Sequence, residues 1–283
     1  MRLRTLCALA LIAGPASAAD YLGSHTWRPE WHGAGGFSAL WLDADGAGFV
    51  VLSDRGGWVR GTVSRDAAGA VSGVTVADRG PLLRSTGDDL RGLERDAEGI
   101  ARAGEAFYVS YEGVHRVMRH SDIAGAPERF EQPDAFEGLQ DNSGLEALAA
   151  DAEGRLYAIP ERSGALNRPF PVWRFDGTDW AVAFHLPRDG RYLVAGADIG
   201  PDGRLYVLER DFALIGFRSR VRSFDLDGGD GRTEIESGLA AHDNLEGISV
   251  WRDAADRLRV TLISDDNLRA IQRTEFVDYA LDR

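Results

Sequence analysis

The chain has 283 residues, 44% of them hydrophobic, which excludes both a disulfide-stapled mini-protein and a disordered chain. It carries 45 acidic and 32 basic side chains, for a formal net charge of −13, so no nucleic acid or membrane surface is expected as a partner. The sequence contains no lysine. This excludes lysine Schiff-base chemistry and a phosphate-binding loop of the Walker type.

Residues 1–18 have the features of a secretory signal peptide. Arg2 and Arg4 precede a short apolar run over residues 5–13, and the small residues 16–18 fit a cleavage site before Ala19. The apolar run is too short to cross a bilayer. We therefore expect a periplasmic or secreted protein with a single domain over residues 19–283. This domain holds no cysteine, since the single Cys is Cys7.

A repeat with a period of about 50 residues governs the rest of the chain. Each copy has a Gly-containing entry, an apolar strand, a turn of the DAEG or PDG kind, and a second apolar strand that ends in a charged cluster. The five copies begin near residues 35, 96, 142, 194 and 243. Two weaker strands follow each hairpin, as over residues 172–177 and 179–187. This layout predicts an all-β propeller of five four-stranded blades.

Six blades remain an alternative, because the first interval between copies is the longest. The last copy has room for only three strands, so we expect residues 24–31 to supply its outer strand and close the ring. Six tryptophans are expected to pack between the blades, where aromatic side chains fill the gaps between twisted sheets. They are Trp27, Trp31, Trp41, Trp173, Trp180 and Trp251.

Acidic residues recur at two positions of the repeat, and core packing does not explain them. The entry of the first strand holds Ser38, Glu98, Glu146, Asp198 and Glu246, and the exit of the second strand holds Asp54, Glu112, Glu161, Glu209 and Asp265. In a propeller the first strand starts at one face and the second strand returns to it. Both sets are therefore predicted to surround the central tunnel at one mouth.

Like charges gathered in this way need a positive partner. Arg55, Arg162 and Arg210 each directly follow an exit carboxylate. A bound Ca²⁺ is the second candidate, because hard cations prefer carboxylate and amide oxygens. The ligands expected for this ion are Glu98, Glu146, Asp198, Glu246 and Asn244, with Asn142 and Asn267 close by. Zn²⁺ is disfavoured, because the sequence shows no histidine pair at ligand spacing.

Three interpretations of the acidic set stay open: salt bridges between blades, a structural Ca²⁺, and a catalytic site. In the catalytic interpretation, Arg55, Arg162 and Arg210 hold an anionic substrate. Glu112, Glu161 or His242 then serves as the general base.

Several motifs resemble those of the bacterial phytase-like family, described as "esterase-like activity of phytase". They are SDRG at Ser53, DAEGIA at Asp96, YVSYEG at Tyr108, GLEALA at Gly144, PER at Pro160 and NLEGIS at Asn244. The resemblance spans the mature chain and implies an exported β-propeller that hydrolyses phosphate or carboxylic esters. The chain departs from the calcium-dependent propeller phytases, which cradle phosphate with several lysines, because it has none.

A looser similarity to lactonase and gluconolactonase propellers implies a catalytic Ca²⁺ at the tunnel mouth. By motif, its ligands would correspond to Glu98, Glu146, Asn244 and Glu246. The predicted function is thus a monomeric, exported, Ca²⁺-dependent hydrolase of a small anionic ester. The alternative is a non-catalytic propeller that binds a small ligand or a protein partner and holds a structural Ca²⁺.

Overall fold

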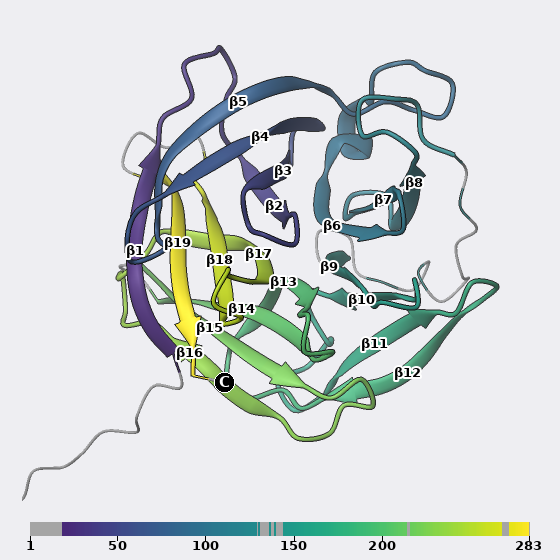
Figure 1. Cartoon of the computed structure of the whole chain (residues 1–283). Coiled ribbons are helices and arrows are strands. Elements are labelled where there is room, and N and C mark those ends of the chain that lie inside the picture. Colours follow the sequence, from purple (N-terminus) through teal and green to yellow (C-terminus); the bar gives the residue numbers. More distant parts are fainter. Residues whose placement is uncertain are drawn as a thin grey trace, which may run out of the picture.

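The protein is a five-bladed β-propeller, as the repeat predicts (Figure 1). A computed structural model describes residues 19–128, 130, 136, 139, 144–213, 216–267 and 272–282. In these residues four blades have four antiparallel strands and one has three. The proposed signal peptide lies outside the described residues. No helix in the described ranges is both long and apolar enough to span a membrane.

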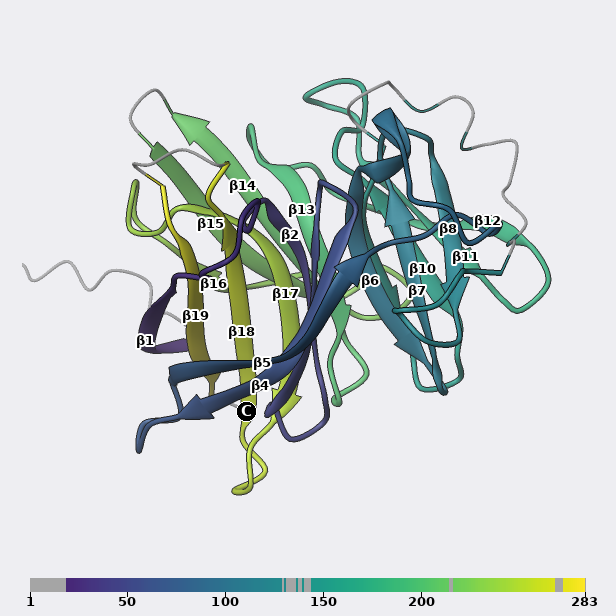
Figure 2. The same ribbon diagram turned by 90° about the horizontal axis from the view of Figure 1, so that it is seen from above.

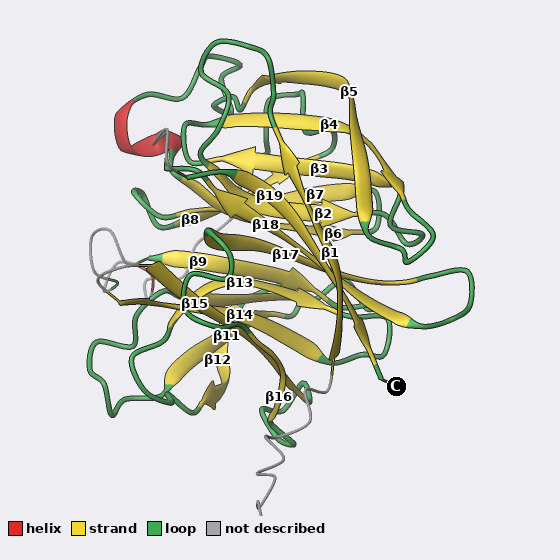
Figure 3. Ribbon diagram, turned by 90° about the vertical axis from the view of Figure 1, so that its left-hand side faces the viewer, coloured by secondary structure: helices red, strands yellow, loops and turns green. Residues whose placement is uncertain are grey.

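In blades 1 to 4 the strands follow the chain from the axis outward. Blade 1 contains β2 (Phe37–Leu42), β3 (Gly48–Ser53), β4 (Gly57–Arg65) and β5 (Val71–Pro81). Blade 2 contains β6 (Ala97–Ala103), β7 (Ala106–Tyr111) and β8 (Arg116–His120), preceded by the 3-10 helix η1 (Gly92–Arg95) that is coloured red in Figure 3. Blade 3 contains β9 (Leu145–Ala150), β10 (Leu156–Pro160), β11 (Phe170–Phe175) and β12 (Trp180–Leu186). Blade 4 contains β13 (Leu193–Ile199), β14 (Leu205–Ala213), β15 (Gly216–Phe224) and β16 (Arg232–Glu236).

Blade 5 joins strands from opposite ends of the sequence. It contains β17 (Asn244–Arg252), β18 (Leu258–Asp265) and β19 (Thr274–Leu281), with β1 (Ala19–Trp27) as its outer strand. Figure 1 shows β1 in purple beside the yellow β19. The antiparallel register runs from Ala19 opposite Leu281 to Trp27 opposite Thr274. The predicted closure is confirmed, although the strand lies further upstream than residues 24–31.

The innermost strands of the five blades contact one another in a closed ring around the axis. They are β2, β6, β9, β13 and β17, and Figure 2 shows β2, β13 and β17 side by side near the centre. In each of them the pairing with the second strand shifts by one residue, which marks a β-bulge. The skipped residues are Ser38, Glu98, Glu146, Ala195 and Glu246. A bulge re-aims its side chain, so these residues define one position at the mouth, the bulge position.

The residue after each bulge is small because the inner strands pack tightly. These residues are Ala39, Gly99, Ala147, Gly196 and Gly247. A Cβ on Gly196 would lie 2.4 Å from the Glu246 carbonyl oxygen, and one on Gly247 would lie 2.7 Å from the Leu40 nitrogen. The space left along the axis is about 10 Å³, which is too small for an organic ligand. An organic ligand therefore does not fit inside the axial channel.

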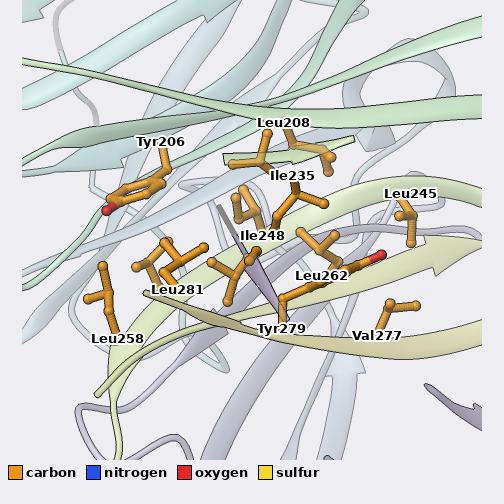
Figure 4. Close-up of a cluster of buried hydrophobic side chains, with 14 of the residues drawn as sticks. Tyr206, Leu208, Ile235, Leu245, Ile248, Leu258, Leu262, Val277, Tyr279 and Leu281 are labelled. Carbon is orange, nitrogen blue, oxygen red and sulfur yellow. The ribbon is translucent and has the colours of Figure 1, made fainter. Parts of the chain in front are cut away.

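Five apolar clusters hold the ring together, one at each interface between neighbouring blades. Figure 4 shows the cluster between blades 4 and 5, where Tyr206 and Leu208 face Leu262 and Val277. All six tryptophans predicted to pack between blades belong to these clusters or pack against them, so that prediction is confirmed. Burial of these large side chains favours the closed ring.

Candidate functional site

The strand register corrects the predicted acidic set in blade 4. Ala195, and not Asp198, occupies the bulge position there. Asp198 lies three residues further along β13, and its carboxylate accepts the backbone N–H groups of Ile199 at 2.8 Å and Val250 at 2.7 Å. Burial raises the pKa of Asp198 to about 7. The side chain thus ties β13 to β17, and its predicted place at the mouth is wrong.

The exit position in blade 4 also differs from the prediction. Glu112 and Glu161 directly follow their second strands, and Asp265 pairs with Asn244 at the end of β18. In blade 4 Glu209 pairs with Val194, one residue further inside, so that Arg210 takes the exit position. The expected place of Glu209 at the mouth is wrong. Blade 4 therefore contributes an alanine and an arginine where the other blades contribute mostly carboxylates.

Arg210 lies among the carboxylates of blades 3 and 5. Its Nη2 is 3.1 Å from Glu146 Oε1 and 3.4 Å from Glu161 Oε1. Its Nη1 is 3.0 Å from Asn244 Oδ1 and also donates to Glu246. Burial lowers the pKa of Arg210, but the neighbouring carboxylates reverse this and leave the pKa above its usual value.

This guanidinium takes the place expected for a metal among Glu146, Glu246 and Asn244. We call Glu146, Glu161 and Glu246 the arginine-bound half of the mouth. A buried charge network of this kind is stable only while both signs are present.

The other half of the mouth is a cluster of Asp96, Glu98 and Glu112, which we call the acidic triad. One carboxylate oxygen of each lies within 4.8 Å of the others. Asp96 directly precedes β6, Glu98 occupies its bulge, and Glu112 follows β7. The Glu112 N–H donates to the Asp96 carbonyl at 2.8 Å, which fixes the two segments side by side. Oxygen donors in this arrangement suit a hard divalent cation.

The acidic triad has raised pKa values, and burial is the largest cause for each of its members. Burial, followed by the charges of Glu146, Asp96 and Glu112, raises the pKa of Glu98 well above its ordinary value. Burial, with Asp96 and Glu161, raises that of Glu112 to about 7. Burial also raises the pKa of Asp54 to about 6, although Arg55 opposes this shift. The triad therefore holds protons near neutral pH, and a cation would displace them.

The remaining predicted site residues fall in different places. Arg55 is exposed beside Asp54, and Arg162 donates from Nε to Glu161 Oε2 at 2.8 Å. His242 Nε2 is 3.0 Å from Tyr279 Oη, and its ring packs on Tyr21, so it contacts the outer strands β19 and β1. Its expected position at the mouth is wrong. Asn142, also expected near the mouth, lies outside the described residues.

The sequence analysis missed Asp96, although a signal for it exists. Asp96 precedes the bulge residue Glu98 by two positions, and Asn244 precedes Glu246 in the same way. Residues two apart at the start of a strand point to the same side. The Asp-x-Glu and Asn-x-Glu patterns therefore mark equivalent pairs in blades 2 and 5.

Raising the pH from 5 to 8 is expected to destabilise the metal-free protein. Glu112 has a folded-state pKa of about 7 against an ordinary value of 4.5. The stability linked to a raised pKa is complete below the ordinary value and is lost as the pH rises through the folded value. After allowance for solvent screening, the loss from Glu112 is on the order of 2 kcal/mol, or about 4 °C in Tm.

Thermal melts in EDTA between pH 5 and 8 test this expectation. Glu112→Gln should flatten the decline, whereas Glu153→Gln, an exposed change on the β9–β10 turn, should not. Added in excess over EDTA, Ca²⁺ should raise the Tm of the wild-type protein at pH 8. It should have little effect on the Tm at pH 5, because protons compete with the cation for the triad. Parallel Tm profiles for Glu112→Gln and the wild type would contradict the assignment.

Comparisons with solved structures give weak similarities, and no curated protein matches the chain. The catalytic domain of a GH62 α-L-arabinofuranosidase from Coprinopsis cinerea is 12% identical with a TM-score of 0.49, over 93% of this chain and 97% of that one. The α-L-arabinofuranosidase PaAbf62A from Podospora anserina, in complex with cellotriose, is 13% identical with a TM-score of 0.48, over 93% and 96%. A chain of a nidogen/laminin complex is 17% identical with a TM-score of 0.46, over 76% and 73%. None of these values supports a transfer of activity.

A family model does match most of the chain. It covers residues 32–268, a range that contains the acidic triad and the arginine-bound half of the mouth. Its description is "Phytase-like: Esterase-like activity of phytase". The five-bladed propeller with an acidic mouth thus belongs to the phytase-like family.

Proposed function

We propose that the protein is an exported ester hydrolase that uses a divalent cation, Ca²⁺, at the mouth of the propeller. The observation that carries this proposal is the acidic triad, in which three carboxylate oxygens lie within 4.8 Å of one another. The leading electrostatic effects on Glu98 all come from other carboxylates. Family membership supports ester hydrolysis, and the signal-like residues 1–18 support export to the periplasm or beyond.

The donor set favours Ca²⁺ among the common cations. Asp96, Glu98 and Glu112 offer only oxygen atoms, which hard cations prefer, and the adaptable coordination of Ca²⁺ suits a ring of unequal side chains. Zn²⁺ prefers nitrogen and sulfur donors, which the triad lacks. A divalent cation held there would polarise an ester oxygen and lower the pKa of a bound water.

We assign the proton transfer to Asp54. Its pKa of about 6 lies near neutrality, where a general base works well, and it is close enough to Asp96 for their charges to interact. Glu112 would be occupied as a ligand, and Glu161 accepts from both Arg162 and Arg210. Arg210 is also engaged by carboxylates, so its role is to keep the arginine-bound half of the mouth neutralised. Arg55, which is exposed, and Arg162, which contacts Glu161 through Nε, are the arginines proposed for a substrate anion.

The test is a substrate panel combined with a metal assay. Purified protein should hydrolyse at least one aryl phosphate, acetyl ester or lactone in Ca²⁺ and lose that activity in EDTA. Glu98→Gln should lose bound metal and lower the rate at least about 100-fold, since it removes a ligand and its charge. Asp54→Asn should keep the metal and lose a similar factor in kcat. Glu153→Gln is the matched control.

Full activity in chelator would refute the metal-dependent mechanism. Stoichiometric Ca²⁺ without turnover on any substrate would favour a propeller that binds a ligand or partner and holds a structural ion.

A further inference from the structure

A cavity of about 420 Å³ opens between blades 3 and 4, beside the arginine-bound half of the mouth. Its walls come from the loop after β10, the loop before β13 and the hairpin β14–β15. In blades 1 to 3 the second strand ends at Ser53, Tyr111 and Pro160, before the exit position, whereas β14 continues past Arg210 to Ala213. This longer hairpin extends one wall of the cavity. The volume is typical of a small-molecule site.

Arginines dominate the polar lining of this cavity. They are Arg162, Arg188, Arg191 and Arg210. Arg162 and Arg210 bind carboxylates of the mouth, and Arg191 lies 3.8 Å from Asp211. Arg188 has no ion pair with any residue in the described ranges. Arg188 is therefore the arginine of the cavity that carboxylates of the described chain influence only without direct contact, through the charges of Glu161 and Glu209.

The contacts of Arg188 are all with neutral groups. Its Nη1 donates to Ser163 Oγ at 3.1 Å and lies 3.5 Å from the Ala165 carbonyl oxygen, and its guanidinium lies 5.2 Å from the centre of the Phe170 ring. Its Nε is buried and has no hydrogen-bond partner in the part of the chain that the structure describes. A buried donor without an acceptor is costly, so the surrounding protein groups do not satisfy Arg188 in full, and its guanidinium can gain from a charged hydrogen bond to an anion.

Apolar side chains line the same cavity. Phe212 is 56% exposed and Leu166 is 65% exposed, and both rank among the large hydrophobic residues that the described chain leaves in solvent. Phe217 supports Phe212, with ring centroids 5.0 Å apart. Exposed apolar groups that share one cavity with convergent charges indicate a ligand with an apolar part.

We propose that this cavity is the specificity pocket for an amphiphilic organic anion. The phosphate or carboxylate head is held by Arg188 and Arg162, and an aryl or alkyl group lies on Phe212 and Leu166. Arg210 lines both the cavity and the mouth, so a ligand seated here lies beside the arginine-bound half, and Arg210 is close enough to Glu112 of the acidic triad for their charges to interact. That such a ligand is a substrate depends on the proposed function, whereas its binding does not.

The test measures binding in EDTA, where hydrolysis cannot contribute. The probe is 8-anilinonaphthalene-1-sulfonate, an aromatic anion that fluoresces in apolar sites, and the competitors are phenyl phosphate, benzoate, inorganic phosphate and phenol. Phenyl phosphate or benzoate should displace the probe, whereas inorganic phosphate and phenol should do so at least tenfold less well. Arg188→Gln and Phe212→Ala should each weaken probe binding about tenfold. The controls are Arg257→Gln and Val182→Ala, which are exposed and outside the cavity lining.

Unchanged probe affinity in both Arg188→Gln and Phe212→Ala would overturn the proposal. Equal displacement by inorganic phosphate and phenyl phosphate would overturn its apolar half, and equal displacement by phenol would overturn its anionic half. Binding as described, without turnover of any ester in Ca²⁺, would confirm the pocket and refute the proposed hydrolysis, so the two failures are distinguishable.

Discussion

Replacing Arg210 with methionine is expected to lower the free energy of unfolding by about 3–5 kcal/mol at pH 8. The change keeps an unbranched side chain without the guanidinium, so it leaves Glu146 and Glu246 without their cation and Glu161 with Arg162 alone. All three carboxylates are buried, so the charges of Glu146 and Glu246 would be unpaired in a poorly solvated site. At about 2–4 °C per kcal/mol, Tm should fall by roughly 10 °C.

Three comparisons make this prediction specific. Arg55→Met removes an exposed arginine from blade 1 and should change Tm by no more than about 1 °C. The decrease in Tm caused by Arg210→Met should be smaller at pH 5, because the unpaired carboxylates then take up protons. Ca²⁺ should stabilise Arg210→Met more than the wild type, since the vacated oxygens can receive a cation. A Tm within 2 °C of wild type at pH 8 would contradict the assigned role.

Glu209→Gln is expected to cost about 3–5 kcal/mol for a related reason. Glu209 is fully buried, and its oxygens accept from Arg220 Nε at 2.6 Å and from Arg222 Nε and Nη2 at 2.7 and 2.6 Å. Both arginines are themselves buried. A glutamine keeps the shape, but it removes the charge and places an NH₂ donor against guanidinium donors.

Urea unfolding measures this cost, with Glu236→Gln on the exposed edge of β16 as the control. The double variant Glu209→Leu/Arg222→Met should recover part of the loss, because it removes both partners of one buried pair. A cost below about 1 kcal/mol for Glu209→Gln, or a double variant that loses as much stability as Glu209→Leu and Arg222→Met added together, would show that the charges are not coupled.

The fold was predictable because its determinants repeat. The pattern of two apolar strands joined by a Gly-containing turn recurs in every blade. It can be recognised in the sequence without knowledge of any contact in the structure. The closing strand was also predictable, since the last copy lacked an outer partner. Six blades, the open alternative, is excluded by the five sheets of the described chain.

The wrong prediction for blade 4 arose because the repeats were aligned on their acidic residues and not on the small residue of the inner strand. At the axis, steric exclusion sets the register: only Gly or Ala fits after the bulge, as Gly196 does against the Glu246 carbonyl. Alignment on this small residue gives Ala195 and Arg210, whereas alignment on acidic side chains gave Asp198 and Glu209. The charge of a surface position varies freely between blades, but the space at the axis does not.

The division of the mouth was not predictable from the sequence. The reach of Arg210 from blade 4 to carboxylates of blades 3 and 5 depends on how the ring closes in space. In the sequence Arg210 directly follows Glu209, which suggests that the two pair. In the structure Glu209 pairs with Arg220 and Arg222 instead. Glu98 was predicted as a ligand, whereas its partner Asp96 required the bulge geometry to be recognised.

The pairing of β1 with β19 also has a kinetic consequence. Ala19 meets Leu281 across nearly the whole sequence, so this contact carries the largest loop-closure entropy in the fold. Blades 1 to 4 can each form from neighbouring segments, but blade 5 must wait until both of its distant parts are present. Blades 1 to 4 can therefore assemble early, whereas the mouth is complete only when blade 5, which supplies Glu246 and Asp265, has closed the ring.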